Sequence, residues 1–450
     1  MTPAPAAAEP VRQRATIVLP SSGAFDSRAW RIASALVSRG HTVTVMGRLE
    51  AGAAAEETHP AGYRIVRVPV SAAAGLPSPL RALRALWTRI RPAPTVAGLG
   101  PPARAAVEPS RRRGVTGRIR SASSAVVRLA AIALTVRSQQ LATRPLAPAA
   151  DLVHAMAYMG IAIGLDLARR DGAAVVYDAR DIYVDAANVA RLPGPARRLF
   201  GAVERRWARR ASRVATVNEP YAAVMEKRFG VPRPLVVMNC SYRREPPAVP
   251  LRLFHERLRL GPATRVVLYQ GGFSRDRGIE QLIDALPSLP DDAVLVLLGY
   301  GSLQAELESR AEEPGLGGRM FILPAVAPTE LLDWVGSADV VAMPIQPSTL
   351  NHRLTTPNKL FEAMAAGVPV VASDLPGMAG IVRETGCGVV CDSTSPAAIA
   401  SAIRAILEAP DSERAAYRER SLAAAHGRYS WESQVEILLA EYGRLTGRPW

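Results

Sequence analysis

The sequence is poor in cysteine, and it has no long apolar runs. Its three cysteines are Cys240, Cys387 and Cys391, an odd number that gives no disulfide framework. The last two lack the partner residues that a zinc site needs, so we expect no metal centre there. This usage indicates a reducing compartment, and the expected location is the cytoplasm. No run of about 18 uncharged apolar residues exists, so we expect no helix that spans a membrane.

Lysine and aromatic residues are also scarce. Lys227 and Lys359 are the only lysines among 55 basic residues, so a lysine is slightly informative in this chain. Aromatic residues make up 5% of the sequence, which leaves few side chains on which bases could stack. No recognised nucleic-acid module accompanies the basic charge, so we expect no nucleic-acid partner.

The positive charge is concentrated in one segment. The net charge is +15, and residues 81–144 hold thirteen arginines and a single acidic residue, Glu108. We therefore treat residues 75–145 as a basic insertion, in which Ala125–Ala142 forms a predicted apolar helix. Two interpretations stay open: a partly disordered insertion with a solvated arginine face, and attachment to an anionic membrane surface.

Short apolar runs alternate with helical patterns through the rest of the chain, which predicts an α/β protein with parallel sheets. A chain of 450 residues is long enough for two such domains. The predicted organisation is a disordered start (1–13), a first domain (14–243), a proline-rich linker (244–260), a second domain (261–425) and a C-terminal helix that packs back on the first domain (426–450).

Polar residues follow the predicted strands of the first domain. Ser22 and Gly23 come after the first strand, and Arg180 and Asp181 come after a later one. Doubly wound sheets bind ligands at the carboxyl ends of their strands, so these residues are candidates for lining a ligand-binding cleft. For Asp181 a turn-forming role is the alternative.

Residues 355–373 predict a helix that leads into a buried strand. Thr356 is the predicted N-cap, Pro357 the first helical residue and Gly367 the helix stop. The helix N-terminus and Lys359 would bind an anion, and Glu362, one turn deeper, would accept hydrogen bonds from neighbouring hydroxyls. A phosphate next to a diol describes a nucleotide sugar. The alternative is an ordinary amphipathic helix on which Lys359 and Glu362 form a solvated pair at the surface.

A glycine-rich loop opens the second domain. It runs from Gly271 and Gly272 to Gly278 and contains Arg275 and Arg277. Glycines and two positive charges together make it a candidate functional loop. A solvated basic loop is the alternative.

These motifs, in this order, resemble the family 4-type glycosyltransferases of the GT-B fold. The resemblance rests on residues 26–28, 40–43, 177–181, 269–272, 277–278, 299–301 and 357–373. It implies an α/β protein in which two doubly wound, Rossmann-like domains face a central cleft. It covers nearly everything from Ala15 to the C-terminus, with the basic insertion, 75–145, as the exception.

The resemblance also implies roles for individual residues. Arg277 would hold the donor pyrophosphate, and with Lys359 it would stabilise charge during catalysis. Glu362 would bind the ribose. The position of a second basic residue is taken by Gly272, so Arg275 is a substitute candidate. Leu354 stands where the family often has a second glutamate that contacts the donor sugar, so Asn351, Asn358 and Lys359 are candidates for recognising the sugar. Further donor-binding candidates are Gly271, Gly272 and Pro357.

The implied activity is transfer of a sugar from a nucleotide-diphosphate sugar to an acceptor, with retention of configuration. No cofactor is expected beyond that donor substrate, and no Asp-x-Asp metal pattern is present. A lipid-linked glycan acceptor at the inner face of the cell membrane is the further hypothesis. The alternatives are an epimerase-like enzyme acting on sugar nucleotides and a catalytically weak binding protein. His154 is expected to be a buried core residue.

Overall fold

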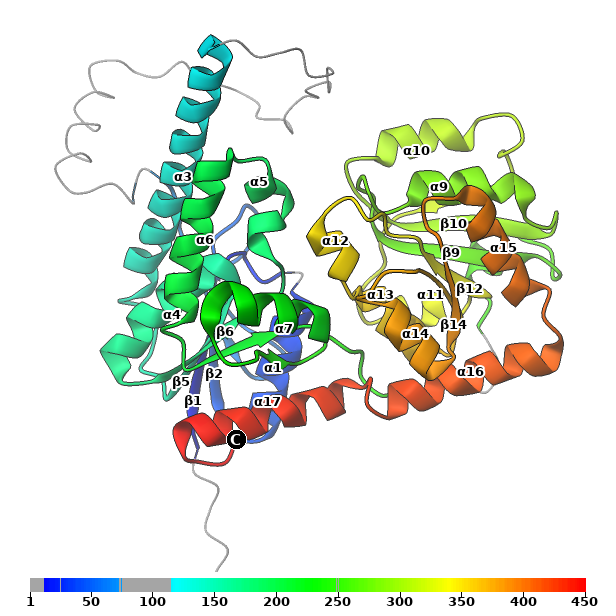
Figure 1. Cartoon of the computed structure of the whole chain (residues 1–450). Coiled ribbons are helices and arrows are strands. Elements are labelled where there is room, and N and C mark those ends of the chain that lie inside the picture. The colour runs from blue at the N-terminus through cyan, green and yellow to red at the C-terminus, as the bar shows by residue number, and fades with distance from the viewer. Residues whose placement is uncertain (1–11, 25, 73, 75–114, 248, 250) are drawn as a thin grey trace, which may run out of the picture.

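Two parallel sheets, each covered by helices on both faces, organise the chain (Figure 1). The computed structural model describes residues 12–24, 26–72, 74, 115–247, 249 and 251–450. Most of the terminus expected to be disordered and residues 75–114 of the basic insertion lie outside this set. Gln13, the last residue of that terminus, is buried, and its side chain donates to the carbonyl of Pro449.

The first sheet has the strand order β3-β4-β2-β1-β5-β6-β7-β8 within the described residues, and only β3 is antiparallel to its neighbour. The winding direction changes between β1 and β5, so the ligand-binding edge of this domain is where those strands end. The strands are β1 (Arg14–Val18), β2 (Thr42–Arg48), β3 (Glu56–Thr58), β4 (Arg64–Val68), β5 (Leu152–Met156), β6 (Ala174–Asp178), β7 (Arg213–Thr216) and β8 (Leu235–Val236).

Helices cover both faces of this sheet. Helices α3, α4 and α6 pack on one face and α1 on the other, each burying an apolar cluster against the strands. Asp26 caps α1 by accepting from the amide of Ala29. The helical segments are α1 (Ser27–Ser38), α3 (Val115–Thr143), α4 (Ala157–Asp171), η1 (Tyr183–Asp185), α5 (Ala187–Ala190), α6 (Gly194–Ala208), α7 (Glu219–Met225) and η2 (Glu226–Gly230).

The second sheet is fully parallel, with the order β11-β10-β9-β12-β13-β14 in the described chain. Its winding changes between β9 and β12. The strands are β9 (Arg265–Gly272), β10 (Ala293–Tyr300), β11 (Met320–Leu323), β12 (Val340–Met343), β13 (Val370–Ser373) and β14 (Gly388–Cys391).

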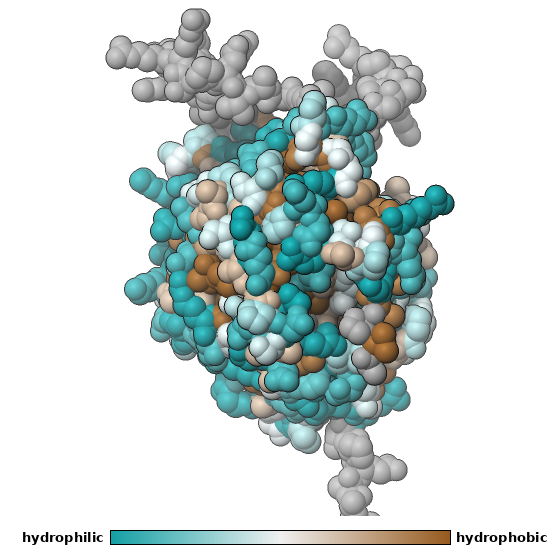
Figure 2. All heavy atoms as spheres, turned by 90° about the vertical axis from the view of Figure 1, so that its right-hand side faces the viewer, coloured by the Kyte–Doolittle hydropathy of each residue, from teal (hydrophilic) through white to brown (hydrophobic). Residues whose placement is uncertain are grey.

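Helices also enclose the second sheet, and polar side chains predominate on its outer side, with apolar ones scattered between them (Figure 2). The helical segments are α8 (Leu253–Leu258), α9 (Ile279–Ala285), η3 (Leu286–Ser288), α10 (Gln304–Ala311), α11 (Leu331–Val335), α12 (Leu350–Leu354), α13 (Asn358–Ala366), α14 (Ala379–Thr385), α15 (Pro396–Leu407) and α16 (Asp411–His426).

Two local predictions need correction. The expected linker, 244–260, contains helix α8, because the buried ring of Phe254 packs edge-to-face on Trp334 and anchors that turn to the second domain. Thr356 does not cap α13: Pro357 occupies the N-cap position, so it is not the first helical residue. The Thr356 hydroxyl instead bonds the carbonyl of Gly377 and accepts from Asn218 of the first domain.

The last helix, α17 (Trp431–Thr446), returns to the first domain as expected. Ser430 caps it, and Trp431, Leu438 and Tyr442 are buried in the cluster beneath α1 and β1. The chain therefore crosses between the domains twice. Among the described residues no helix is both long and apolar enough to cross a membrane.

Candidate functional site

Lys359 lies at the point where α13 begins and β9 ends. Its Nζ is 3.7 Å from the centroid of the Tyr269 ring, a cation–π contact. Gly271 has φ +118°, and a Cβ placed there would be 3.7 Å from the same Nζ. A Cβ would fit at that distance, so the positive φ, rather than space, is what favours glycine at the end of β9. Two of the predicted site residues, Gly271 and Lys359, therefore lie next to each other.

Glu362 lies one turn further along α13. One of its carboxylate oxygens accepts a hydrogen bond of 2.8 Å from Nε2 of Gln270. Burial raises the pKa of Glu362, against the opposing charges of Arg31 and Lys359. The carboxylate is only partly enclosed, so it can still accept hydrogen bonds from a bound molecule.

Arg277 adds positive charge next to Lys359. Burial lowers the pKa of Lys359 to about 7, and the charge of Arg277 acts in the same direction. Gly278 makes the loop possible: it has φ +77°, and a Cβ there would lie 1.8 Å from the carbonyl oxygen of Pro344. We call Tyr269, Gln270, Gly271, Arg277, Lys359 and Glu362 the Lys359 cluster.

Arg275 does not join this cluster. Its side chain is 67% exposed and pairs with Glu306 at 3.0 Å and with Glu280 at 3.7 Å, both on helices that follow the loop. Gly272, which replaces the usual second basic residue, has no atom within 4 Å of the position of a Cβ. The structure thus brings Arg277, but not Arg275, to Lys359.

Asn351 connects the two domains. Its Oδ1 accepts from the amide of Ile182 at 3.0 Å and from the Tyr221 hydroxyl at 2.6 Å, and its Nδ2 donates to Asp181 at 2.9 Å. The amide is therefore occupied by first-domain groups. The predicted residues Asn351 and Asp181 do meet, but as partners of each other.

The other candidates of the first domain lie at the loops that follow β1 and β6. Arg180 donates to both carboxylate oxygens of Asp26 at 2.8 Å, which ties these two loops together. Ser22 and Gly23 line a hollow of about 450 Å³ beside Arg67, whose Nε donates to the carbonyl of Ser22.

A buried polar chain supports that edge. The Tyr442 hydroxyl lies 2.7 Å from Nδ1 of His154, whose Nε2 lies 3.1 Å from Asp178, and Asp178 pairs with Arg28 at 2.6 Å. Burial alone would raise the pKa of Asp178, but Arg28 and His154 outweigh it and hold the pKa well below its usual range. His154 is buried, as expected, and it links α17 to the first sheet.

Sequence reasoning assigned no role to Tyr269, Gln270 or Arg31. The first two directly precede the glycine loop at the end of β9, which was the available signal. Arg31 comes from α1 of the first domain, donates to Asn239 at 2.9 Å, and interacts electrostatically with Glu362. Only the folded arrangement brings this residue to the second domain.

The start of α13 completes the site. Pro357 has extended backbone and precedes the first helical residue, Asn358, which is exposed. The first N–H groups of a helix have no partner within it, and they carry partial positive charge. Together with Arg277 and Lys359 they form a strongly anion-attracting site. The described residues contain no cluster of three or more metal-binding side chains.

Comparison with solved structures defines the class of fold. The chain superimposes on sucrose-phosphate synthase from Thermosynechococcus elongatus with a TM-score of 0.70, covering 97% of this chain and 100% of that one at 18% identity. This likeness over nearly the whole chain, together with the two parallel-sheet α/β domains, confirms the predicted two-domain GT-B fold.

The sequence defines the family. Residues 253–422 match the family described as glycosyl transferases group 1, and residues 23–240 match the glycosyl transferase 4-like domain. The two ranges span most of the chain. The chain belongs to the family 4-type glycosyltransferases, as the resemblance implied.

Curated relatives match over shorter ranges. A D-inositol 3-phosphate glycosyltransferase from Xylanimonas cellulosilytica is 33% identical over 197 residues, which cover 43% of this chain and 45% of the relative. A GDP-mannose-dependent alpha-(1-6)-phosphatidylinositol monomannoside mannosyltransferase from Mycobacterium tuberculosis is 28% identical over 260 residues, covering 51% and 67%. The chain thus aligns with about half the length of the first of these relatives.

Proposed function

We propose that the protein is a glycosyltransferase that moves a sugar from a nucleotide-diphosphate sugar to an acceptor hydroxyl, with retention of configuration. The observation that carries this proposal is the Lys359 cluster: two cations and a helix N-terminus, with a carboxylate one turn away. The cations suit the diphosphate, and Glu362 suits the ribose hydroxyls. Membership of the family supports the same activity.

The proposed sugar transfer depends on stabilising the negative charge that develops on the departing diphosphate. The bond between the anomeric carbon and the phosphate oxygen breaks, so negative charge accumulates on the departing diphosphate. Arg277, Lys359 and the α13 N-terminus stabilise that charge in place before the reaction begins. The acceptor oxygen forms the new bond to the anomeric carbon, and its proton passes to the departing phosphate oxygen. We propose that no metal ion is required for these steps.

The acceptor would approach from the first domain. Arg180, Asp181 and Arg31 lie at the loops and helix of the first domain that face this approach. Arg180 is paired with Asp26, whereas Arg31 has no carboxylate within ion-pair distance among the described residues and is the cation left for an anionic acceptor. The two relatives are named for acceptors that carry a phosphate on inositol. We therefore propose a phosphate-bearing polyol acceptor, free or linked to a lipid.

Acceptor-dependent release of nucleoside diphosphate tests this proposal. Purified protein is incubated with UDP- and GDP-sugars, with and without inositol 3-phosphate or phosphatidylinositol in vesicles. We expect one donor to release diphosphate only when an acceptor is present, with a product heavier by one sugar. Isomerisation of the donor without transfer would instead establish an epimerase. No acceptor-dependent release with any combination would contradict the proposal.

We further propose that the basic insertion holds the protein on the inner face of an anionic membrane. Each arginine near such a surface contributes on the order of 1 kcal/mol. In the described part, Val127 and Leu141 of α3 are 66% and 47% exposed, so apolar side chains accompany the charge.

Co-sedimentation with vesicles tests the attachment. We expect binding to vesicles that contain phosphatidylglycerol, and loss of binding at about 1 M salt, where the Debye length falls to about 3 Å. The control variant replaces the arginines of residues 81–113 by serine and keeps the chain length. Equal sedimentation of the two proteins, or none with either, would exclude this role for the segment.

A further inference from the structure

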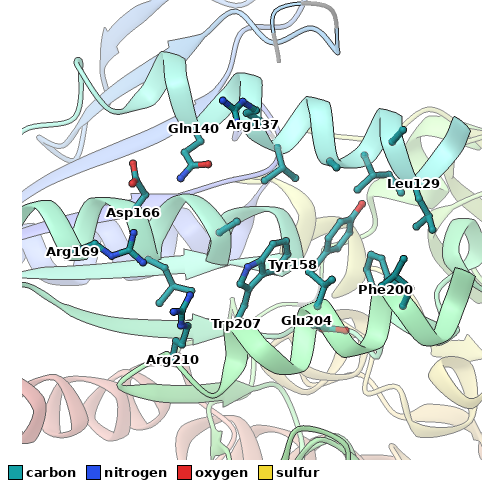
Figure 3. Close-up of a pocket in the computed structure, with 18 residues that line it drawn as sticks. Leu129, Arg137, Gln140, Tyr158, Asp166, Arg169, Phe200, Glu204, Trp207 and Arg210 are labelled. Carbon is teal, nitrogen blue, oxygen red and sulfur yellow. The ribbon is translucent and has the colours of Figure 1, made fainter. Parts of the chain in front are cut away.

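A groove runs between α3, α4 and α6, on the first-domain face that these helices cover (Figure 3). Its volume is about 730 Å³, within the range of pockets that enclose a small-molecule ligand. Side chains from all three helices line it, and most are apolar. Representative members are Ala133 and Val136 of α3, Ala162 and Leu165 of α4, and Val203 and Trp207 of α6.

Apolar side chains at this groove are unusually exposed. Leu199 and Val203 of α6 are 58% and 36% exposed, and both line it. Contiguous exposed apolar surface on a protein commonly marks a binding site. Glu204, which also lines the groove, does not make it strongly polar: its carboxylate accepts from the Tyr177 hydroxyl at 2.8 Å, and burial raises its pKa to about 7.

One end of the groove is cationic. Arg137 of α3, Arg169 of α4 and Arg210, which lies in the turn after α6, line this end together with Gln140 (Figure 3). The carboxylate at that end, Asp166, is paired with Arg144 at 2.7 Å. None of the three arginines has a carboxylate within ion-pair distance among the described residues, so this end carries unneutralised positive charge.

The opposite end is aromatic and reaches toward the interdomain edge. Tyr158 packs edge-to-face on Phe200 and on Tyr183, with centroid separations of 5.0 and 5.2 Å. Tyr183 belongs to η1, two residues after Asp181, which bonds Asn351 of the second domain. The groove therefore combines an anion-attracting end with an apolar channel that ends behind the candidate acceptor-side loop.

We propose that this groove binds the acyl chain of an anionic phospholipid, with the phosphate of the lipid at Arg137, Arg169 and Arg210. The apolar channel removes the chain from water, and the cationic end selects a negatively charged headgroup over a neutral one. This inference rests on the proposed attachment to an anionic membrane and extends it from a charged surface to a defined lipid site.

Calorimetric titration of the full chain with single-chain lipids below their micellar concentration tests the site, because no membrane surface is then present. The probes are lysophosphatidylglycerol and lysophosphatidylcholine, which differ in net charge. We expect saturable binding of one lysophosphatidylglycerol per chain, about tenfold tighter than lysophosphatidylcholine.

Two pairs of variants locate the binding. Ala133→Trp fills the groove from an exposed helical position, and Ala131→Trp places the same bulk on the same helix outside it. We expect the first to weaken binding of both lipids about tenfold and the second to leave it unchanged. Arg169→Glu with Arg210→Glu should weaken only the anionic lipid, whereas Arg197→Glu with Arg206→Glu, outside the groove, should not.

Several results would overturn the proposal: no lipid binding by the full chain, equal affinity for the two lipids, or equal effects of the groove variants and their controls. Transfer to free inositol 3-phosphate, measured in parallel, separates this inference from the proposed function. Ala133→Trp should keep wild-type transfer to that soluble acceptor. Lipid binding without any transfer would contradict the proposed function alone.

Discussion

The surroundings of Lys359 lower the pKa of its ammonium group. The side chain lies between the Tyr269 ring and the charge of Arg277, and burial lowers its pKa to about 7. At neutral pH the ammonium group is therefore partly deprotonated when the site is empty. A bound diphosphate would supply the missing negative charge and raise the pKa again.

This coupling predicts proton uptake on ligand binding. Above pH 7 the free protein holds Lys359 largely neutral, and the complex holds it charged, so affinity for a nucleoside diphosphate should fall as pH rises from 7 to 9. Titration calorimetry in buffers of different ionisation enthalpy at pH 8 should reveal uptake of up to about one proton per site. Lys359→Arg should abolish that uptake, and uptake equal to that of the wild-type protein would disprove the assignment.

The charged partners in the cluster give a second prediction. Arg277→Ala and Glu362→Ala should each lower kcat/KM at least about tenfold, because a charge-assisted hydrogen bond contributes roughly 1.5–3 kcal/mol. Arg275→Ala is the matched control, since that side chain pairs with Glu306 away from the cluster. Initial rates and circular dichroism would be measured for all three. Wild-type rates in the first two would remove the proposed roles of these residues.

The sequence predicted which charged residues form the Lys359 cluster, but not the directions in which the neighbouring side chains point. Lys359 and Glu362 stand in one local motif, so their grouping could be anticipated from spacing, whereas Arg277 was added through the family resemblance. Arg275 could not be separated from Arg277 by spacing, because the direction of the Arg275 side chain depends on Glu306 and Glu280 in later helices. Arg31 was missed because it reaches Glu362 only through the packing of one domain against the other.

Among the secondary-structure elements, the short helix α12 of the second domain packs against the first domain. Leu350 and Leu354 pack on the apolar cluster of the first domain, and Asn351 bonds three of its groups. Leu354 stands where the resembling family has a sugar-binding glutamate, and its apolar packing gives that substitution a physical reason. The sequence showed the replacement, but only the fold shows what the leucine contacts.

Loss of the α12 contact should open the molecule. Asn351→Ala removes hydrogen bonds worth about 1 kcal/mol each, so the ligand-free protein should become more extended, with a larger radius of gyration in small-angle X-ray scattering. His352→Ala is the control on the same helix, because His352 bonds Ser348 of its own domain. If the radii of gyration of the two variants were the same, Asn351 would have no part in holding the domains together.

At the scale of the whole molecule, both sheets change winding direction at their first strand, and both therefore present ligand-binding edges. The alternation of strands and helices in the sequence predicted the parallel sheets, and the family resemblance implied that they are doubly wound. Helix α8 within the expected linker was not predicted, because that turn is held in place by the packing of Phe254 on Trp334. The buried chain from Tyr442 to Arg28 was equally hidden, because it joins residues from distant parts of the chain.

The charge balance of the assembled site predicts insensitivity to chelation. In the proposed mechanism Arg277, Lys359 and the helix N-terminus stabilise the departing diphosphate, and no step involves a divalent cation. Transfer rates should be unchanged within about twofold after dialysis against EDTA. Loss of activity that Mn²⁺ or Mg²⁺ restores would show that a metal ion supplies the charge stabilisation instead.

The most direct test of the central claim is a crystal structure of the protein with uridine or guanosine diphosphate bound. The account predicts the diphosphate at the start of α13, within hydrogen-bond distance of Arg277 and Lys359, and the ribose hydroxyls on Glu362. A nucleotide bound elsewhere, or one whose diphosphate contacts neither cation, would contradict it.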